Sequence, residues 1–345
     1  MRKIIREIFA SIAVVLLAPN IVLAQFVKIT PLGSHAGELC QNDRALLFED
    51  PTGVRILYDV GATVAGGTDP RLGEVHVVLL SHAHGDPIGE QKAAGLDAGS
   101  CANPQTVSAA PNSNTAEIAA AKNSALVVSV DMGAFLGKKI QNIKGVQTVP
   151  CPTAGLARET VLPRTSPCLA VFQLGGKRIV KMTEQATGVQ IAMVPANHSN
   201  SAPRSLLTDP EKTNLAADNL TAYVGQASGY VLSFTNGLRV YLSGDTAMMG
   251  DMKTIIAGYY KVNLAVLNVA GAMESEEAAF AVNELIQPNA VIPSHASEAA
   301  TTGGKVRPES KAKQFIDLVK GRPVHLPLSG RTIQFDGNAK CIAGC

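Results

Sequence analysis

The sequence predicts an α/β protein in which buried strands end in polar, metal-ligating side chains. Two observations lead to this prediction. The apolar, largely β-branched run over residues 75–80 is typical of a buried strand, and His82, His84 and Asp86 follow it within a few residues. Further along the chain, strands come first and then alternate with helical segments, in two successive series. This order favours a layered fold with helices packed outside sheets.

The first residues of the chain predict a secretory signal peptide over 1–24. Arg2, Lys3 and Arg6 precede an apolar run over residues 8–19, and Val22-Leu23-Ala24 forms a small-x-small cleavage site. The run is shorter than the roughly 20 residues that span a bilayer, so we expect no stable membrane anchor. We therefore expect a periplasmic or secreted protein whose mature part, residues 25–345, is a single domain.

Charge and composition narrow the class of partner. The chain has 30 Lys and Arg against 28 Asp and Glu, and the leader holds three of the basic residues and one of the acidic ones. The mature chain is therefore balanced, with no basic run to grip phosphates and no Trp to stack bases. We expect a small-molecule substrate and no nucleic acid. Nothing in the sequence indicates the oligomeric state.

Six cysteines, an even number in an exported chain, predict disulfide bonds. Cys151 with Cys168 and Cys341 with Cys345 are near-neighbour pairs, although six cysteines allow 15 pairings. No Cys-x-x-Cys spacing supports a thiolate metal site instead. We expect the bridges to be structural.

The first half of the mature chain predicts a run of strands and then mixed elements. Strands are expected over 26–30, 44–48, 54–59 and 75–80. A helix from Asn114 to Lys122, a strand over 125–130 and a short helix over 132–139 are expected after them. Asn114 and Glu117 have the spacing of a helix cap and its third-position acid. The turn-rich segment 141–164 is expected to pass over the site. His76 lies inside a strand and is expected to be a hydrogen-bonded core residue, whereas His35 is expected in a solvated loop.

The second half repeats the pattern and supplies three more candidate residues. A strand over 189–195 leads to His198, and the polar segment 199–219 is either a lid or a disordered loop. The turn Asn236-Gly237 joins two strands of a hairpin, the second of which leads to Asp245. Strands over 264–269 and 290–293, the latter leading to His295, and helices over 274–286 and 310–319 complete the chain.

The ordered set of ligating residues resembles the metallo-β-lactamase superfamily. His82-x-His84-x-Asp86 is similar to its signature His-x-His-x-Asp-His, and His198, Asp245 and His295 follow in the family's order. Pro87 stands where the signature has its last His. The resemblance covers roughly residues 26–319 and implies a four-layer αββα sandwich. The segment from Ala272-Met273-Glu274 to His295 also resembles the ascorbate-6-phosphate-lactonase branch.

The resemblance implies a metal site and a ligand for each position in it. His82, His84 and His198 would hold a first ion, Asp86 and His295 a second, and Asp245 would bridge them. Pro87 offers no ligand atom and so weakens the second position. Zn²⁺ is the expected metal, as one or two ions, and iron or manganese suits the same ligand types. Asp59 is expected either to orient a ligand or to be a plain turn residue.

The activity that this implies is hydrolysis by a metal-bound hydroxide, with Asp86 and Asp245 as catalytic residues. Asp86 would accept a hydrogen bond from the nucleophile and orient it. The substrate would be a small ester, lactone, amide or phosphoester. Two alternatives stay open: a mononuclear iron oxidoreductase of the same fold, and a non-catalytic metal-binding protein.

Overall fold

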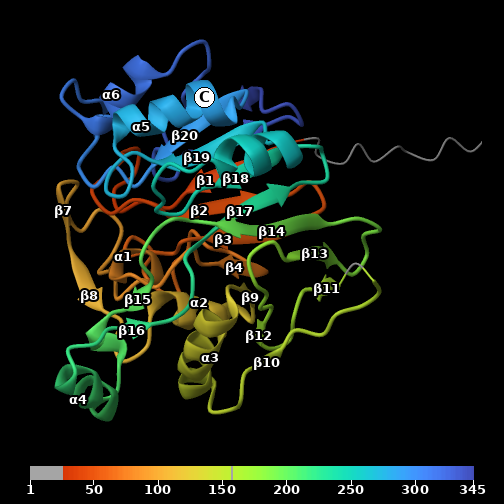
Figure 1. Ribbon diagram of the computed structural model, residues 1–345, viewed down its shortest axis with the longest axis vertical. Coiled ribbons are helices and arrows are strands. Elements are labelled where there is room, and N and C mark those ends of the chain that lie inside the picture. Colours follow the sequence, from red (N-terminus) through yellow and green to blue (C-terminus); the bar gives the residue numbers. More distant parts are fainter. Residues whose placement is uncertain (1–25, 157) are drawn as a thin grey trace, which may run out of the picture.

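The computed structural model describes residues 26–156 and 158–345, so the predicted signal peptide lies outside the described residues. Within these ranges most strands form two large sheets, which are stacked face to face (Figure 1). The first sheet, in spatial order, consists of β10 (Val149–Pro150), β12 (Cys168–Leu169), β9 (Ala125–Val127), β4 (Val77–Leu79), β3 (Arg55–Tyr58), β2 (Leu46–Glu49), β1 (Val27–Pro31), β23 (Ile333–Phe335) and β24 (Cys341–Ala343). The second consists of β11 (Glu159–Leu162), β13 (Lys177–Met182), β14 (Val189–Pro195), β17 (Ser228–Ser233), β18 (Arg239–Leu242), β19 (Leu264–Asn268) and β20 (Ala290–Ser294).

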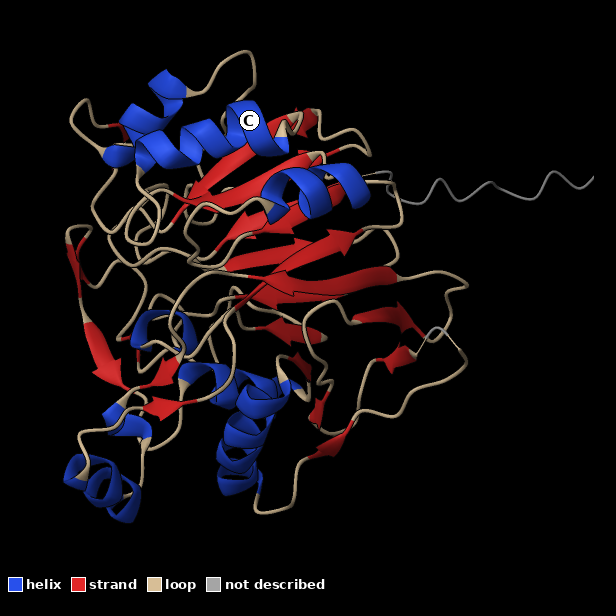
Figure 2. Ribbon diagram, viewed as in Figure 1, coloured by secondary structure: helices blue, strands red, loops and turns tan. Residues whose placement is uncertain are grey.

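Helices cover the outer face of each sheet (Figure 2). Those beside the first sheet are α2 (Asn114–Lys122) and α3 (Val130–Lys144); those beside the second are η2 (Met252–Tyr259), α5 (Ser275–Phe280), η3 (Ala281–Ile286) and α6 (Lys311–Leu318). The remaining helical turns are α1 (Gly85–Ile88), η1 (Arg204–Leu206) and α4 (Asp209–Ala217). Four two-residue or three-residue strand pairs complete the fold: β5 (Gln91–Ala93) with β8 (Thr106–Ser108), β6 (Gly99–Ser100) with β7 (Asn103–Pro104), β15 (Ser201–Ala202) with β16 (Ala222–Tyr223), and β21 (Thr301–Thr302) with β22 (Lys305–Val306).

Alternation of side chains along the strands builds three apolar layers. In β17, Tyr230 and Leu232 point between the two sheets, while Val231 points to the helices outside the second sheet. The core between the sheets also receives Phe48 from the first sheet, and the outer face of that sheet packs on helix residues such as Leu136. The four-layer αββα prediction is confirmed. None of the helices that the structure describes is long and apolar enough to cross a bilayer.

Local signals in the sequence account for several element boundaries. The hairpin at Asn236-Gly237 joins β17 to β18, with Gly237 at a φ of +97° that favours glycine. Ser310 caps α6 by accepting the backbone N–H of Lys313, as the predicted helix over 310–319 requires. The cap of α2 is Ser113, one residue before the predicted Asn114.

One expectation for a loop was wrong, and one of two alternatives for another loop is excluded. Much of the segment 141–164 does not pass over the site: it completes α3 and then supplies β10 and β11 to the edges of the two sheets. The segment 199–219 is not a disordered loop, because it contains α4, and its role as a lid stays a prediction. Thr208 and Glu211 form a capping box at the start of that helix, a signal that is visible in the sequence.

The six cysteines form three disulfides. The predicted pairs Cys151–Cys168 and Cys341–Cys345 are confirmed, and the third bridge joins Cys40 to Cys101 across 61 positions of the chain. Two of the bridges involve strands of the first sheet: Cys168 is the first residue of β12, and Cys341 is the first residue of β24.

Candidate metal centre

The candidate residues follow the carboxyl ends of four strands. His82 and His84 come after β4 of the first sheet, whereas His198, Asp245 and His295 come after β14, β18 and β20 of the second. Because the ends of these strands meet at one edge of the stacked sheets, the loops that leave them converge. His295 has a φ of +49°, a backbone conformation rare for histidine, which turns the chain directly after β20.

The three histidines at positions 82, 84 and 198 form a compact cluster. Their ring centroids are 4.7 to 4.9 Å apart, and all three pairs of rings meet edge to face. Nε2 of His198 lies 3.2 Å from Nδ1 of His84. One nitrogen from each ring lies within 4.8 Å of the other two, so the three rings can share one cation.

A hydrogen-bond chain fixes the orientation of His82. Asp59 accepts the backbone N–H of Ser81 through Oδ1 and its hydroxyl through Oδ2, both at 2.8 Å. Because the Ser81 hydroxyl donates its only hydrogen to the hydrogen bond with Asp59, its oxygen accepts a hydrogen bond from Nδ1 of His82 at 2.9 Å. This places the lone pair of His82 on Nε2, inside the cluster. The expectation that Asp59 orients a ligand agrees with these contacts.

His82 is a neutral imidazole with a free acceptor. Its side chain has no solvent exposure, and burial lowers its pKa to about 3. Nε2 finds no hydrogen-bond partner among the described residues. A buried nitrogen lone pair without a partner is costly, and a cation bound at this position would satisfy it. The pKa of His198 is lowered as well, chiefly by burial, so its imidazole also favours the neutral form that binds metals.

The acidic half of the site lies against the histidine cluster. Oδ2 of Asp245 is 3.6 Å from Nε2 of His82, and one oxygen each of Asp86 and Asp245 lies within 4.8 Å of a His82 nitrogen. His295 contacts both carboxylates, with Nε2 3.2 Å from Asp86 and Nδ1 3.5 Å from Asp245. The structure therefore brings all six predicted residues together, from positions more than two hundred residues apart.

Arg44 is the residue that sequence reasoning missed. Its side chain is 3% exposed, just before β2, and its guanidinium donates to Oδ2 of Asp86 and to Oδ1 of Asp245, both at 2.7 Å. Burial raises the pKa of each carboxyl group, but the charges of Arg44, His295 and His82 together outweigh burial and hold both pKa values below the usual range. The only sequence feature that could have indicated this role is the position of Arg44 at the start of an apolar strand, and this is a weak indication.

Second-sheet residues brace the loop that carries the histidines. Asn200 accepts the backbone N–H of Ala83 at 2.7 Å, and Ser228 donates its backbone N–H to the carbonyl of Ser81 at 2.9 Å. Tyr230 donates to the carbonyl of Leu80 at 2.8 Å. The site is thus held on packed strands rather than on free loops.

The other described histidines lie apart from this cluster. His76 is 5% exposed and accepts the backbone N–H of Arg55 at 3.0 Å, as expected of a core histidine. His35 contacts the neighbouring Ser34 hydroxyl, and its ring Nε2 is buried, so it is less solvated than predicted.

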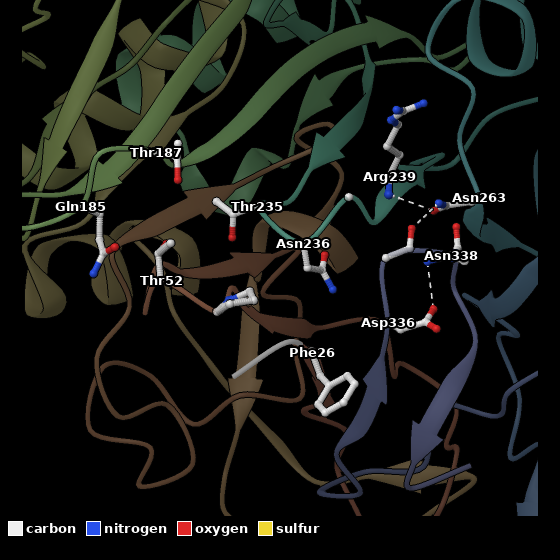
Figure 3. Close-up of a pocket in the computed structure, with 13 residues that line it drawn as sticks. Phe26, Thr52, Gln185, Thr187, Thr235, Asn236, Arg239, Asn263, Asp336 and Asn338 are labelled. Carbon is white, nitrogen blue, oxygen red and sulfur yellow. Dashed lines mark hydrogen bonds between the residues drawn. The ribbon is translucent and has the colours of Figure 1, made fainter. Parts of the chain in front are cut away.

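A cavity of about 810 Å³ lies near the start of β18 and of β19, and Figure 3 shows residues that line it. Arg239 begins β18 and Asn263 precedes β19, and the two are joined by a hydrogen bond of 2.8 Å from the Arg239 backbone N–H. The cavity is lined by amide, hydroxyl and backbone groups with one arginine and one aspartate, and none of its lining residues is a histidine or cysteine. Its size does not make it the reactive site, because the convergent ligating groups are elsewhere.

Comparison with known proteins finds metal-dependent hydrolases among the relatives of this chain. No family model matches the chain. It is 28% identical over 304 residues to a UPF0173 metal-dependent hydrolase of Koribacter versatilis, covering 87% of this chain and 97% of the relative. A UPF0173 metal-dependent hydrolase of Cupriavidus taiwanensis is 26% identical over 313 residues, covering 88% of each chain. Among solved structures, the metallo hydrolase Igni18 of Ignicoccus hospitalis matches with a TM-score of 0.53 at 20% identity, over 90% of this chain and 99% of that one.

The four-layer sandwich with a histidine and aspartate cluster at one edge of its sheets defines a protein of the metal-dependent hydrolase class. These relatives and the shared fold agree with the resemblance to the metallo-β-lactamase superfamily that the sequence indicates. The comparisons do not single out the ascorbate-6-phosphate-lactonase branch, which stays a prediction.

Proposed function

We propose that the chain is an exported hydrolase that cleaves a small ester, lactone, amide or phosphoester at a metal ion held by His82, His84 and His198. The observation that carries this proposal is the convergence of three histidine rings around the partnerless Nε2 of His82. Three imidazoles with a carboxylate beside them are typical of catalytic rather than structural zinc sites. An ion bound there supplies Lewis acidity, which polarises the substrate and makes water more acidic.

Exposure indicates how a substrate approaches. His82 is fully buried and forms the floor of the site, whereas the side chains of His295 and Asp86 are 20% and 39% exposed. A small molecule would therefore enter past Asp86 and His295 and meet the histidine cluster below them. This opening, at a loop edge without a basic surface run, suits a small substrate better than a nucleic acid.

Asp86 and Asp245 have different tasks in this proposal. The contacts of Asp86 with Arg44 and His295 are both made through Oδ2, so Oδ1 would be able to accept a hydrogen bond from the attacking water and orient it. Asp245 is almost buried, follows a strand of the second sheet and accepts a hydrogen bond of Arg44 through Oδ1. Because its pKa is lowered, Asp86 stays ionised at neutral pH and acts as a hydrogen-bond acceptor throughout.

Removal of a cluster histidine tests the metal assignment. We expect His82→Ala or His198→Ala to lose most of the bound metal and to reduce hydrolysis by more than roughly 100-fold, because two imidazoles hold an ion much less tightly than three. Bound metal is measured by mass spectrometry, and hydrolysis on a panel containing an ester, a lactone, a β-lactam and a phosphodiester. His325→Ala, at a histidine outside the cluster that packs on Phe335, is the matched control.

The same measurements decide between the proposal and its two alternatives. A variant that keeps metal and activity would contradict the assignment of its histidine. Imidazole and carboxylate ligands suit iron as well as zinc, so purified protein that contains iron and hydrolyses nothing on the panel would favour the oxidoreductase. Bound metal without any reaction would favour a non-catalytic metal-binding protein.

A further inference from the structure

The acidic half of the site already contains a cationic side chain, Arg44. Its three candidate ligands are Asp86, Asp245 and His295, and the carboxylate oxygens nearest to the His295 ring are Oδ2 of Asp86 and Oδ1 of Asp245. These are the same two oxygens that accept the hydrogen bonds of Arg44. An ion placed between these ligands would compete with the guanidinium for both oxygens.

We propose that the guanidinium of Arg44 takes the place of a second metal ion, so that the enzyme binds one ion only. The inference rests on the proposed function, which assigns the first ion to the three histidines. Arg44 joins one carboxylate that follows a strand of the first sheet to one that follows a strand of the second. A bridging cation would make the same connection.

The surroundings of Arg44 are built to keep it there. The chain at Gly61 leaves room for its stem: a Cβ at this position would lie 3.1 Å from Cγ of Arg44 and 3.1 Å from the carbonyl oxygen of Asp86. The side chain is almost wholly buried, and the planar fork of a guanidinium suits two carboxylate oxygens at once. A guanidinium also keeps its charge at any ordinary pH, so this cation cannot be lost by titration.

Charge balance supports the same conclusion. Asp59, Asp86 and Asp245 place three carboxylates around the buried side chain of Arg44, and two of them, Asp86 and Asp245, accept its hydrogen bonds. The carboxylates of Asp86 and Asp245 would repel each other if no cation lay between them. A divalent ion added beside the guanidinium would instead meet a positive charge in a buried setting, where repulsion is strong.

Pro87 fits this arrangement. It is buried in α1 and offers no ligand atom, so the chain lacks a fourth ligand at the point where the arginine supplies a cation. Pro87 also accepts the backbone N–H of Gly61 through its carbonyl at 3.1 Å, next to the stem of Arg44. The missing ligand and the added cation are therefore neighbours in space. Arg44 is a positioning residue here, because it acts through the two aspartates.

Metal stoichiometry tests this inference without reference to activity. The mature protein is stripped with a chelator and titrated with Zn²⁺ and with Co²⁺, and bound metal is counted by calorimetry, mass spectrometry and the cobalt absorption spectrum. We expect one equivalent for the wild type and still one for Pro87→His, because the arginine still occupies the carboxylates. Arg44→Met should bind a second equivalent, and Arg44→Met/Pro87→His should bind it at least ten-fold more tightly.

Two further variants control for charge and for folding. Arg44→Lys keeps a positive charge between the aspartates and should stay at one equivalent. Arg178→Met removes another buried arginine, one that bonds Thr160 in the second sheet, and should also stay at one. If Arg44→Met does not fold, the wild type and Pro87→His still decide the question.

The possible outcomes separate this inference from the proposed function. Two equivalents in the wild type or in Pro87→His would overturn the role of Arg44 and leave the histidine site intact. One equivalent in a folded Arg44→Met/Pro87→His variant would also overturn it. No bound metal in the wild type would overturn the proposed function together with this inference.

Discussion

At the scale of single residues, one hydroxyl group prepares His82 for a metal. Ser81 lies between the Asp59 carboxylate and Nδ1 of His82, and it bonds both at less than 3 Å. Because it donates to the carboxylate, it accepts from the imidazole and thereby selects the tautomer with a free Nε2. The proposed metal site therefore depends on Ser81, a residue that offers it no ligand atom.

Ser81→Ala should weaken metal binding without abolishing it. The imidazole would lose the partner that fixes its tautomer and its ring orientation, a loss that typically lowers metal affinity by roughly 10-fold to 100-fold. The dissociation constant for Zn²⁺ is measured by competition with a chromophoric chelator. Ser124→Ala is the control, since Ser124 is a buried serine whose hydroxyl bonds only the carbonyl of Val75. Equal affinities in the two variants would refute this role of Ser81.

At the scale of elements, the site depends on how the two sheets are held together at their strand ends. Tyr230 of β17 crosses from the second sheet to the first and donates to the carbonyls of Leu80 and Val127, at 2.8 and 3.2 Å. Its ring also meets Tyr58 of β3 edge to face, with centroids 6.5 Å apart. One side chain therefore links the strand that precedes His82 to the neighbouring sheet.

Tyr230→Phe should lower the free energy of unfolding by about 1 to 3 kcal/mol, because two buried carbonyl groups lose their common donor while the ring still fills the core. Urea denaturation of the metal-free protein measures this change. Tyr223→Phe, at a tyrosine that is 64% exposed, should leave the stability within about 0.5 kcal/mol of the wild type. A Tyr230→Phe variant as stable as this control would show that the hydroxyl does not hold the sheets together.

At the scale of the whole molecule, the disulfides agree with the proposed export. All six cysteines are paired, and Cys40–Cys101 fastens the loop that leads to Arg44. Asp43, in the same loop, accepts the backbone N–H groups of Ser34 and Cys40, each at 2.8 Å. Such bridges form and persist in oxidising compartments.

Expression of the full chain in a bacterial host tests the export. We expect the protein in the periplasmic fraction, cleaved after Ala24, with an unreduced mass lower by six hydrogens than that of the reduced chain. A version that lacks residues 2–24 is the control and should stay in the cytoplasm with reduced cysteines. Uncleaved full-length protein in the cytoplasm would contradict both the predicted signal peptide and the predicted export.

The local part of this protein could be predicted from its sequence. The strand before His82, the Asn236-Gly237 hairpin and the helix after Ser310 follow from short-range patterns, and the ordered histidines and aspartates indicated the layered fold through their resemblance to a family. Hydrophobic periodicity, turn chemistry and capping act over a few residues, so a sequence displays them directly. The helix α4 was missed although its capping box was visible, which was an error of interpretation and not a lack of signal.

Only the tertiary structure decided what surrounds the ligating residues. Arg44 lies 42 positions before Asp86 and 201 before Asp245, and no local pattern marks an arginine that folding will bury between them. The path of residues 141–164 along the sheet edges was equally hidden, since strand pairing is a long-range choice. The sequence by itself determined which histidines and aspartates can bind a cation. The packing of the two sheets determined that Asp86 and Asp245 bind the guanidinium of Arg44, because a buried charge pairs with the opposite charge that the fold places beside it.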